Sequence, residues 1–193
     1  MLSVQEGGSK VKKYAQTLCL LLLIFLVYSC ASQPPFPPEW RYEKEAIKIR
    51  LRADALLNLY DGLPHTLHVC VYQLKDPNAF NQLSEDEEGL YKLLECAGFD
   101  GSVISHKELS IQPGQDATFV VDRAEGAKYV ALVAGYYILR KDSMVRLFDV
   151  PVIVKKKGFL SRTKVCKAAT LSIDLGLGPQ RIKAAGRPVV LEF

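Results

Sequence analysis

Residues 47–71 read IKIRLRADALLNLYDGLPHTLHVCV, and this stretch decides the fold class. Apolar and basic side chains alternate over residues 47–52, which is the period-two pattern of a strand with one buried face. The alternation resumes in residues 67–71, after a segment rich in turn-forming residues. The stretch therefore predicts two strands joined by a loop, with Val69 and Val71 on the buried face of the second strand.

Further segments of strand length follow along the chain. Residues 109–111 run into Pro113-Gly114, a turn signal, and residues 119–121 come next. Residues 129–137 are apolar throughout and predict a central strand that is covered on both faces. The remaining segments are 145–154, 170–175 and an edge strand at 189–191. Seven to eight short strands at this spacing predict an all-β sandwich.

One helix is predicted between the second and third strands. Ser84-Glu-Asp-Glu87 has the spacing of a capping box, with acidic residues in the first turn, where the helix dipole favours them. Gly98 follows as a stop signal. Four residues fall on the apolar face of this helix: Leu90, Leu93, Leu94 and Ala97.

The N-terminus has the organisation of an export signal. Three lysines precede an uncharged apolar run at residues 18–28. A helix of that length covers about 16 Å, roughly half of a ~30 Å hydrocarbon core, so the run suits the h-region of a signal peptide. Val27-Tyr-Ser-Cys30 resembles the lipobox of bacterial lipoproteins, although Tyr28 replaces the usual small residue. We expect cleavage after Ser29 and acylation of Cys30; the alternatives are a non-lipidated signal and a one-pass anchor.

The segment after this cysteine separates the signal from a folded domain. Residues 31–40 read ASQPPFPPEW, and four prolines predict an extended, semi-rigid tether. We therefore divide the chain into a signal peptide (1–29), a lipidated cysteine with a Pro-rich tether (30–41) and a β-sandwich domain (42–193). Because the first 29 residues hold three of the 25 basic and one of the 21 acidic side chains, the remainder has 22 and 20. A net charge of +2 is too small to indicate nucleic-acid binding.

The cysteines allow at most one disulfide in the exported domain. With Cys19 in the signal and Cys30 acylated, Cys70, Cys96 and Cys166 remain. Three is an odd number, so one thiol stays unpaired. The periplasm permits a bridge, but the sequence does not identify the pair.

Few residues carry catalytic or metal-binding chemistry. The histidines are His65, His68 and His106, and the chain has no Gly-x-Ser-x-Gly, His-Glu-x-x-His or phosphate-binding loop. His68 and Cys70 share one strand face, so a metal site with His106 is one interpretation. The preferred interpretation is an ordinary strand face that is partly covered by the helix. We therefore expect a protein that binds and is not an enzyme, with no metal and no cofactor.

Several motifs, in order along the chain, resemble one protein family. Asn58, Gly62-Leu63-Pro64 and the strand LHVCVYQL at 67–74 are similar to the signature of TssJ, the outer-membrane lipoprotein of type VI secretion systems. The resemblance covers most of residues 45–150, although Val145-Arg146 stands where the family usually carries Trp-Arg. It continues through Lys75-Asp76, Phe80, Leu90-Tyr91 and the strand at 129–136.

The resemblance implies a fold, a location and a partner. The fold is a transthyretin-like β-sandwich with one helical insertion between the second and third strands. The protein would be lipid-anchored in the outer membrane and face the periplasm. There it would help to assemble the secretion membrane complex by binding the periplasmic C-terminal domain of an IcmF-family inner-membrane protein (TssM). The contact loop of the family corresponds here to Leu57, Asn58, Leu59, Tyr60, Asp61, Gly62, Leu63 and Pro64.

The apolar side chains of this loop have two interpretations from the residues alone. Leu57, Leu59, Tyr60 and Leu63 lie among Asn, Asp, Gly and Pro, which force a turn. If they are exposed, they have the character of interface anchors. If they fold back, they cap the open end of the sandwich instead.

Other hypotheses stay open beside that of a lipoprotein that docks onto a partner protein. A periplasmic transthyretin-like lipoprotein could instead bind a small ligand or glycan on its sheet, which a ring of exposed aromatic side chains would favour. A metal-dependent periplasmic enzyme would require bound zinc. The basic segment Lys155–Lys167 contains no acidic residue; it is either a hairpin loop that contacts anionic head groups or an acidic partner, or a solvated loop. The preferred reading involves neither nucleic acid nor a small-molecule substrate.

Overall fold

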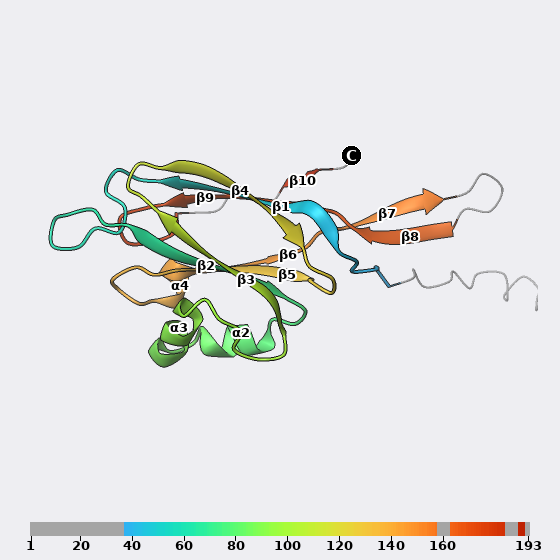
Figure 1. The fold of residues 1–193 in the computed structure, drawn as a ribbon, viewed down its shortest axis with the longest axis horizontal. Helices are drawn as coiled ribbons and strands as arrows, with labels where there is room; N and C mark the ends of the chain where they lie inside the picture. The colour runs from blue at the N-terminus through green and yellow to red at the C-terminus, as the bar shows by residue number, and fades with distance from the viewer. Residues whose placement is uncertain (1–36, 158–162, 184–188, 192–193) are drawn as a thin grey trace, which may run out of the picture. The chain divides into compact units, whose positions relative to one another are not determined.

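Two four-stranded β-sheets pack against each other in the computed structural model, which describes residues 37–157, 163–183 and 189–191 (Figure 1). One sheet has the strand order β10-β9-β1-β4, and the other has the order β3-β2-β5-β6. The buried residues between the sheets form one hydrophobic core. The all-β sandwich predicted from the sequence is confirmed. No helix within the described ranges is long and apolar enough to cross a membrane.

The first sheet is built around its longest strand, β1. This strand pairs with β4 in the antiparallel direction and with β9 in the parallel direction. Ile47, Ile49 and Leu51 are fully buried in the core, as their alternation predicts. The basic residues between them point outward, and Arg50 forms an ion pair with Asp116 on the neighbouring strand. The strands span Glu43–Ala53 (β1), Asp116–Arg123 (β4), Thr170–Leu177 (β9) and Val189–Leu191 (β10).

The second sheet is buried on both faces along its two central strands. Val69 and Val71 of β2 face the core, whereas Cys70 and Tyr72 belong to a second buried cluster under the helices. Every residue from Val130 to Ala134 of β5 is buried, which confirms a central strand covered on both sides. The strands span Leu67–Leu74 (β2), Val103–Ile111 (β3), Tyr129–Ala134 (β5) and Val145–Asp149 (β6).

The Tyr72-Gln73 pair at the end of β2 ties this strand to two other layers of the fold. The Tyr72 hydroxyl donates to the Leu93 carbonyl oxygen in the helical insertion, at 2.5 Å. The Gln73 amide donates to the Asp122 carbonyl oxygen and its oxygen accepts from the Ala124 N–H, both at 2.8 Å. Because Gln73 is buried, these bonds satisfy polar groups that water does not reach.

The insertion between β2 and β3 contains two helices, not one: α2 (Asn78–Leu83) and α3 (Glu87–Leu94). Ser84 ends α2 in a helical conformation, and its hydroxyl donates back to the Asn81 carbonyl oxygen. The N-cap of α3 is Asp86, whose extended backbone lets its carboxylate accept from the Gly89 N–H at 2.7 Å. The capping box predicted at Ser84 is therefore wrong by two residues.

The C-terminal end of the predicted helix is also wrong. α3 ends at Leu94, and Cys96 then adopts a left-handed backbone with φ of 50°. Leu90 and Leu93 pack inward as expected, but Ala97 is exposed beyond the helix. The disulfide that holds Cys96 against β2 stops the helix before Gly98 is reached.

Replacing Asp86 with Ala tests which residue caps α3. We expect the free energy of unfolding to fall by about 1 kcal/mol, because one N–H of the first turn loses its acceptor. Urea unfolding followed by circular dichroism measures this change. Glu85→Ala removes a neighbouring carboxylate that has no role in the cap and forms an exposed ion pair with Lys141, so it should change stability less. An equal loss in both variants would argue against the Asp86 cap.

The segment 145–154, predicted as one strand, forms two. β6 ends at Asp149, and β7 (Val152–Lys157) begins after Pro151, which has no N–H to continue a ladder. β7 then pairs with β8 (Thr163–Ala168) in a two-stranded hairpin that belongs to neither sheet. The basic segment thus includes residues of both strands of this hairpin, although residues 158–162 and the side chains of 155–165 lie outside the described part. The described residues contain ten strands, compared with seven to eight expected.

A buried arginine fixes the place where β1 begins. The Arg123 side chain is 2% exposed; it forms an ion pair with Glu43 at 2.8 Å and donates to the Arg41 carbonyl oxygen at 3.1 Å. Lys167 of β8 also contacts Glu43. Partial burial raises the pKa of the Glu43 carboxyl, but the hydrogen bonds from Lys167 and Arg123 outweigh it, so the pKa lies below its ordinary value. The chain entering β1 is therefore attached to β4 and β8.

Candidate docking site

The loop between β1 and β2 ends in a tight turn with a defined shape. Tyr60 and Leu63 exchange two backbone hydrogen bonds, each of 3.0 Å. Between them Asp61 and Gly62 both have positive φ, of 48° and 75°. This is the backbone of a type I′ turn, for which Asp-Gly is a preferred pair. The turn places the side chains of Tyr60 and Leu63 next to each other at the tip.

The base of the loop is attached to two other loops at the same end of the sandwich. Asn58 is buried with a left-handed backbone, and its side-chain oxygen accepts from the Tyr137 N–H at 3.3 Å in the β5–β6 connection. Its amide donates to the Thr66 carbonyl oxygen at 3.2 Å. The Leu59 N–H donates to the Pro179 carbonyl oxygen at 2.7 Å, beyond β9. These bonds hold the tip in one position relative to its neighbours.

Exposed apolar side chains gather at this tip. The rings of Tyr60 and Tyr137 are stacked, with centroids 4.2 Å apart and an interplanar angle of 17°. Their exposed fractions are 56% and 52%, and those of Leu63 and Ile138 are 63% and 50%. Apolar groups that remain exposed together on a soluble domain indicate an interaction site. We call these four residues, Tyr60, Leu63, Tyr137 and Ile138, the tip surface.

The loop residues predicted to bind a partner differ in how far they are exposed. Leu57 is fully buried in the core, so it is a core residue and not an exposed anchor. Leu59 is half-buried, and Asn58 has the structural role described above. The exposed members are Tyr60, Asp61, Gly62, Leu63 and Pro64. The loop therefore contains both buried and exposed apolar residues, and docking by the exposed ones stays a prediction.

Two members of the tip surface, Tyr137 and Ile138, were missed by the sequence analysis. Tyr137 was predicted to end a strand over 129–137 and Ile138 was given no role, but β5 ends at Ala134. Gly135 was the available signal, because an isolated glycine inside a strand pattern marks an irregularity. The connection that follows contains one short helix, α4 (Lys141–Met144).

A small cavity adjoins the tip surface. A cavity of about 180 Å³ lies beside Tyr60, Tyr137 and Pro179. Tyr136 packs below it and is 2% exposed; burial raises the pKa of its hydroxyl, which finds no hydrogen-bond partner among the described residues. Nearby, the hydrogen bond from Lys183 holds the pKa of the Asp54 carboxyl below its ordinary value.

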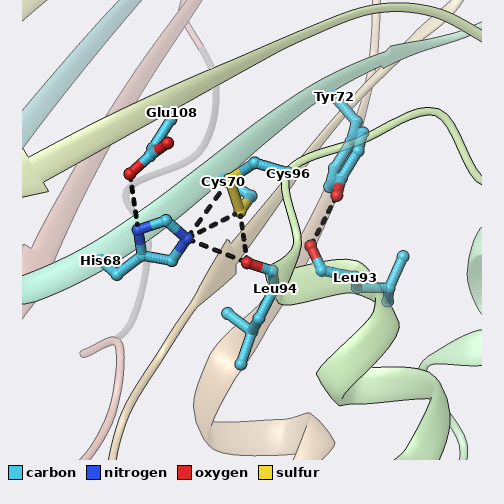
Figure 2. The surroundings of a disulfide bond; sticks show 7 residues. All are labelled: His68, Cys70, Tyr72, Leu93, Leu94, Cys96 and Glu108. Carbon is cyan, nitrogen blue, oxygen red and sulfur yellow. Dashed lines mark hydrogen bonds and ion pairs between the residues drawn. A yellow bond between two sulfur atoms is a disulfide. The ribbon is translucent and has the colours of Figure 1, made fainter.

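His68, Cys70 and Cys96 lie elsewhere, on the helix-covered face of β2 (Figure 2), whereas His65 packs against Tyr60 and Tyr137 at the tip. Cys70 and Cys96 form a disulfide, and Cys166 is buried and unpaired within the described residues. His68 lies beside this disulfide. His106 does not join it, because it stands opposite Tyr72 on β3. The site of His68, Cys70 and His106 considered from the sequence is therefore not formed, and Cys96 takes the place of His106.

Comparisons with known proteins agree on one family. The family model for the type VI secretion lipoprotein (VasD, EvfM, TssJ, VC_A0113) matches residues 45–173, more than half of the chain. The chain belongs to this family of type VI secretion lipoproteins. A comparison with curated proteins finds no match.

Solved structures show the same fold. The T6SS lipoprotein TssJ1 from Pseudomonas aeruginosa is 22% identical, with 78% of this chain and 98% of that chain covered and a TM-score of 0.51. Serratia marcescens Lip, a membrane-bound component of the Type VI Secretion System, is 16% identical, with 74% and 96% covered and a TM-score of 0.52. A chain in the structure of the T6SS protein TssM C-terminal domain (869-1107) from EAEC is 16% identical, with 75% and 98% covered and a TM-score of 0.51.

Proposed function

We propose that the protein is anchored in the outer membrane through acylated Cys30 and faces the periplasm. Its tip surface docks onto the periplasmic C-terminal domain of an IcmF-family inner-membrane protein (TssM). The protein acts as a tether that helps to assemble the secretion membrane complex, and it works by binding instead of catalysis. Family membership and the fold shared with a chain from a TssM C-terminal-domain structure support this proposal.

The observation that carries the proposal is the preorganised tip surface. Tyrosine is among the residue types that contribute most binding energy at interfaces, and Tyr60 and Tyr137 are stacked before any partner binds. The type I′ turn and the hydrogen bonds of Asn58 already fix the loop. Docking therefore costs little additional ordering of backbone or side chains, which favours affinity.

The tip surface lies beyond the far end of β1 from the residue where this strand begins. β1 begins at Glu43 and has 11 residues, which at ~3.3 Å per residue span roughly 35 Å before the loop starts. Figure 1 shows the β1–β2 loop at one end of the sandwich and the β7–β8 hairpin at the other end, beside the first described residues. The tip surface is thus at the opposite end of the folded domain from the start of β1 (Figure 1).

The alternative of a small-ligand or glycan site has less support at this surface. The cavity beside the tyrosine pair, at about 180 Å³, is smaller than the ~300–1,000 Å³ of typical ligand pockets. Tyr136 is buried, so it adds no exposed ring to the pair formed by Tyr60 and Tyr137. A protein partner uses such an exposed, stacked pair better than a small molecule does.

Replacing Tyr60 and Leu63 with Ser tests the docking role. We choose Leu63 instead of Leu59 because Leu59 is half-buried and its loss would also disturb the fold. Affinity for the purified periplasmic domain of the TssM-type protein should fall by ~2–4 kcal/mol, the usual scale for interface anchors. That corresponds to roughly 30- to 1,000-fold in dissociation constant. Titration calorimetry with the full-length protein in detergent measures this change.

Tyr91→Ser is the matched control for this experiment. Tyr91 lies on α3 and is 58% exposed, nearly the same as Tyr60, but it is not part of the tip surface. Its loss should leave affinity unchanged. Unchanged affinity in the tip variant, with its melting temperature preserved, would place the interface elsewhere. A tip variant that loses stability instead would show that Tyr60 and Leu63 serve to cap the sandwich.

A further inference from the structure

His68 lies between two sulfur atoms and a carboxylate (Figure 2). Its Nε2 atom is 3.3 Å from Cys70 Sγ and 3.4 Å from Cys96 Sγ. Its Nδ1 atom is 3.3 Å from a Glu108 carboxylate oxygen. The one nitrogen and two sulfurs that could act as ligands all lie within 4.8 Å of one another. One imidazole nitrogen thus faces both cysteines, and the other faces an acidic group.

Three separate elements bring these groups together. His68 and Cys70 are two residues apart on β2, so their side chains share one face of the strand. Cys96 follows the end of α3, and Glu108 stands opposite Cys70 on β3. The Cys70 side chain is fully buried, whereas that of His68 is 35% exposed. The cluster is therefore built into the fold and is open to solvent on the imidazole side.

The same histidine and two cysteines can act as metal ligands once the disulfide is reduced. A dithiol reductant transfers two electrons and two protons to the disulfide, which yields two thiols while the reductant becomes a disulfide. Two cysteine thiolates and a neutral imidazole nitrogen are preferred ligands of zinc. For tetrahedral zinc, bond lengths of about 2.3 Å to sulfur and 2.0 Å to nitrogen set the sulfur–nitrogen separation near 3.5 Å. The two Nε2–Sγ distances already have this value within about 0.2 Å.

Glu108 prepares His68 for this role. A metal-binding histidine commonly donates its other ring N–H to a carboxylate, which fixes the tautomer and the ring orientation. Here a Glu108 carboxylate oxygen lies 3.3 Å from Nδ1 and favours the proton on that nitrogen, which leaves the lone pair of Nε2 free for a cation beside the sulfurs. The Leu94 carbonyl oxygen, 3.0 Å from Nε2, lies beside the place for a fourth ligand, which this oxygen or a water molecule can fill.

We propose that His68, Cys70 and Cys96 bind one zinc-type divalent cation when the disulfide is reduced, with Glu108 as a positioning residue. Binding displaces the two thiol protons, so each metal ion releases two protons. The connection between β2 and the end of α3 is then made either by a covalent bond or by a metal ion. The helical insertion stays attached to the sheet in both redox states.

Cobalt(II) is the probe that tests this site, because thiolate ligands give it an intense near-ultraviolet charge-transfer band. The full-length protein in detergent is reduced with a phosphine under inert gas, separated from the reductant and titrated with cobalt. We expect one equivalent to bind with thiolate absorption, and zinc to displace it. The oxidised protein should show no such band. A reduced protein that gives no thiolate band would overturn the proposal.

Variants separate the proposed ligands from other residues. Cys70→Ser and Cys96→Ser should abolish the two-thiolate spectrum, and His68→Ala should weaken binding at least tenfold. Glu108→Gln should weaken it by about 10- to 100-fold, as is usual for the carboxylate partner of a ligating histidine. His106→Ala and Cys166→Ser are the matched controls and should bind normally.

His68→Ala keeps both cysteines, so its fold can be checked in the oxidised state by circular dichroism. This variant keeps the test valid even where a cysteine variant fails to fold. Cobalt binding that is unchanged in a folded His68→Ala variant, or lost in Cys166→Ser, would contradict the assignment of ligands.

Discussion

Val69→Asp should prevent the domain from folding cooperatively. Val69 is 1% exposed in the core, and its partners across β3 and β5 are Leu109 and Ala134. None of these groups can pair with a carboxylate, so the charge would be both desolvated and unpaired. Such a change costs several kcal/mol, which is comparable with the ~5–15 kcal/mol that stabilises a whole domain. Thermal unfolding followed by circular dichroism measures the effect.

Two further substitutions show that the position, and not the new charge alone, decides this result. Val120 on β4 is 45% exposed, so Val120→Asp should leave the melting temperature nearly unchanged. Val71 is buried, but Lys107 stands opposite it on β3, and Val71→Asp should therefore be less damaging than Val69→Asp. If Val69→Asp melted within a few degrees of the unchanged protein, the register of β2 would be wrong by one residue.

Period-two alternation explains why the sheets could be predicted. A strand with one buried face must alternate, and residues 47–51 do so because β1 has the core on one side and solvent on the other. A strand buried on both faces loses the alternation, as β5 does over Val130–Ala134, but its short apolar run is still recognisable. The core could therefore be read from the sequence alone.

Local competition between side chains explains where the prediction failed. Ser84 and Asp86 are both good N-cap residues, and only the tertiary packing of α2 decides that Ser84 ends one helix while Asp86 begins the next. The prediction of the tip surface was incomplete for a similar reason. Tyr60 and Leu63 lie on a turn with a sequence signature. Tyr137 is 77 residues away from Tyr60 in the sequence, and no local pattern indicates that the two rings stack.

The cysteine pair required three-dimensional information. Each of Cys70, Cys96 and Cys166 is buried, so burial does not distinguish them. The left-handed turn at Cys96 brings its Cα atom to 5.2 Å from that of Cys70, within the range for a disulfide. Closing a loop of 26 residues stabilises the fold by about 3.5 kcal/mol in the chain-entropy model. This bridge thus connects the helical insertion to the second sheet.

Cys30→Ser should release the protein from the membrane. The substitution removes the only atom in the Val27-Tyr-Ser-Cys30 segment that can accept a thioether-linked lipid. Each buried CH₂ of an acyl chain contributes roughly 0.8 kcal/mol to membrane attachment, so losing two or more chains leaves nothing of comparable strength. Palmitate labelling should disappear, and the protein should move from the membrane fraction to the soluble fraction or remain uncleaved at its signal peptide.

Cys19→Ser is the matched control, because Cys19 lies inside the apolar run of the proposed signal peptide and is removed by cleavage after Ser29. If cleavage after Ser29 occurs as proposed, this variant should keep full labelling and membrane fractionation, since serine at one position leaves the run almost entirely apolar. Labelling that persists in Cys30→Ser with unchanged fractionation would exclude lipidation at this cysteine. The protein would then need a different attachment to the membrane, and the tip surface would not be tethered through residue 30.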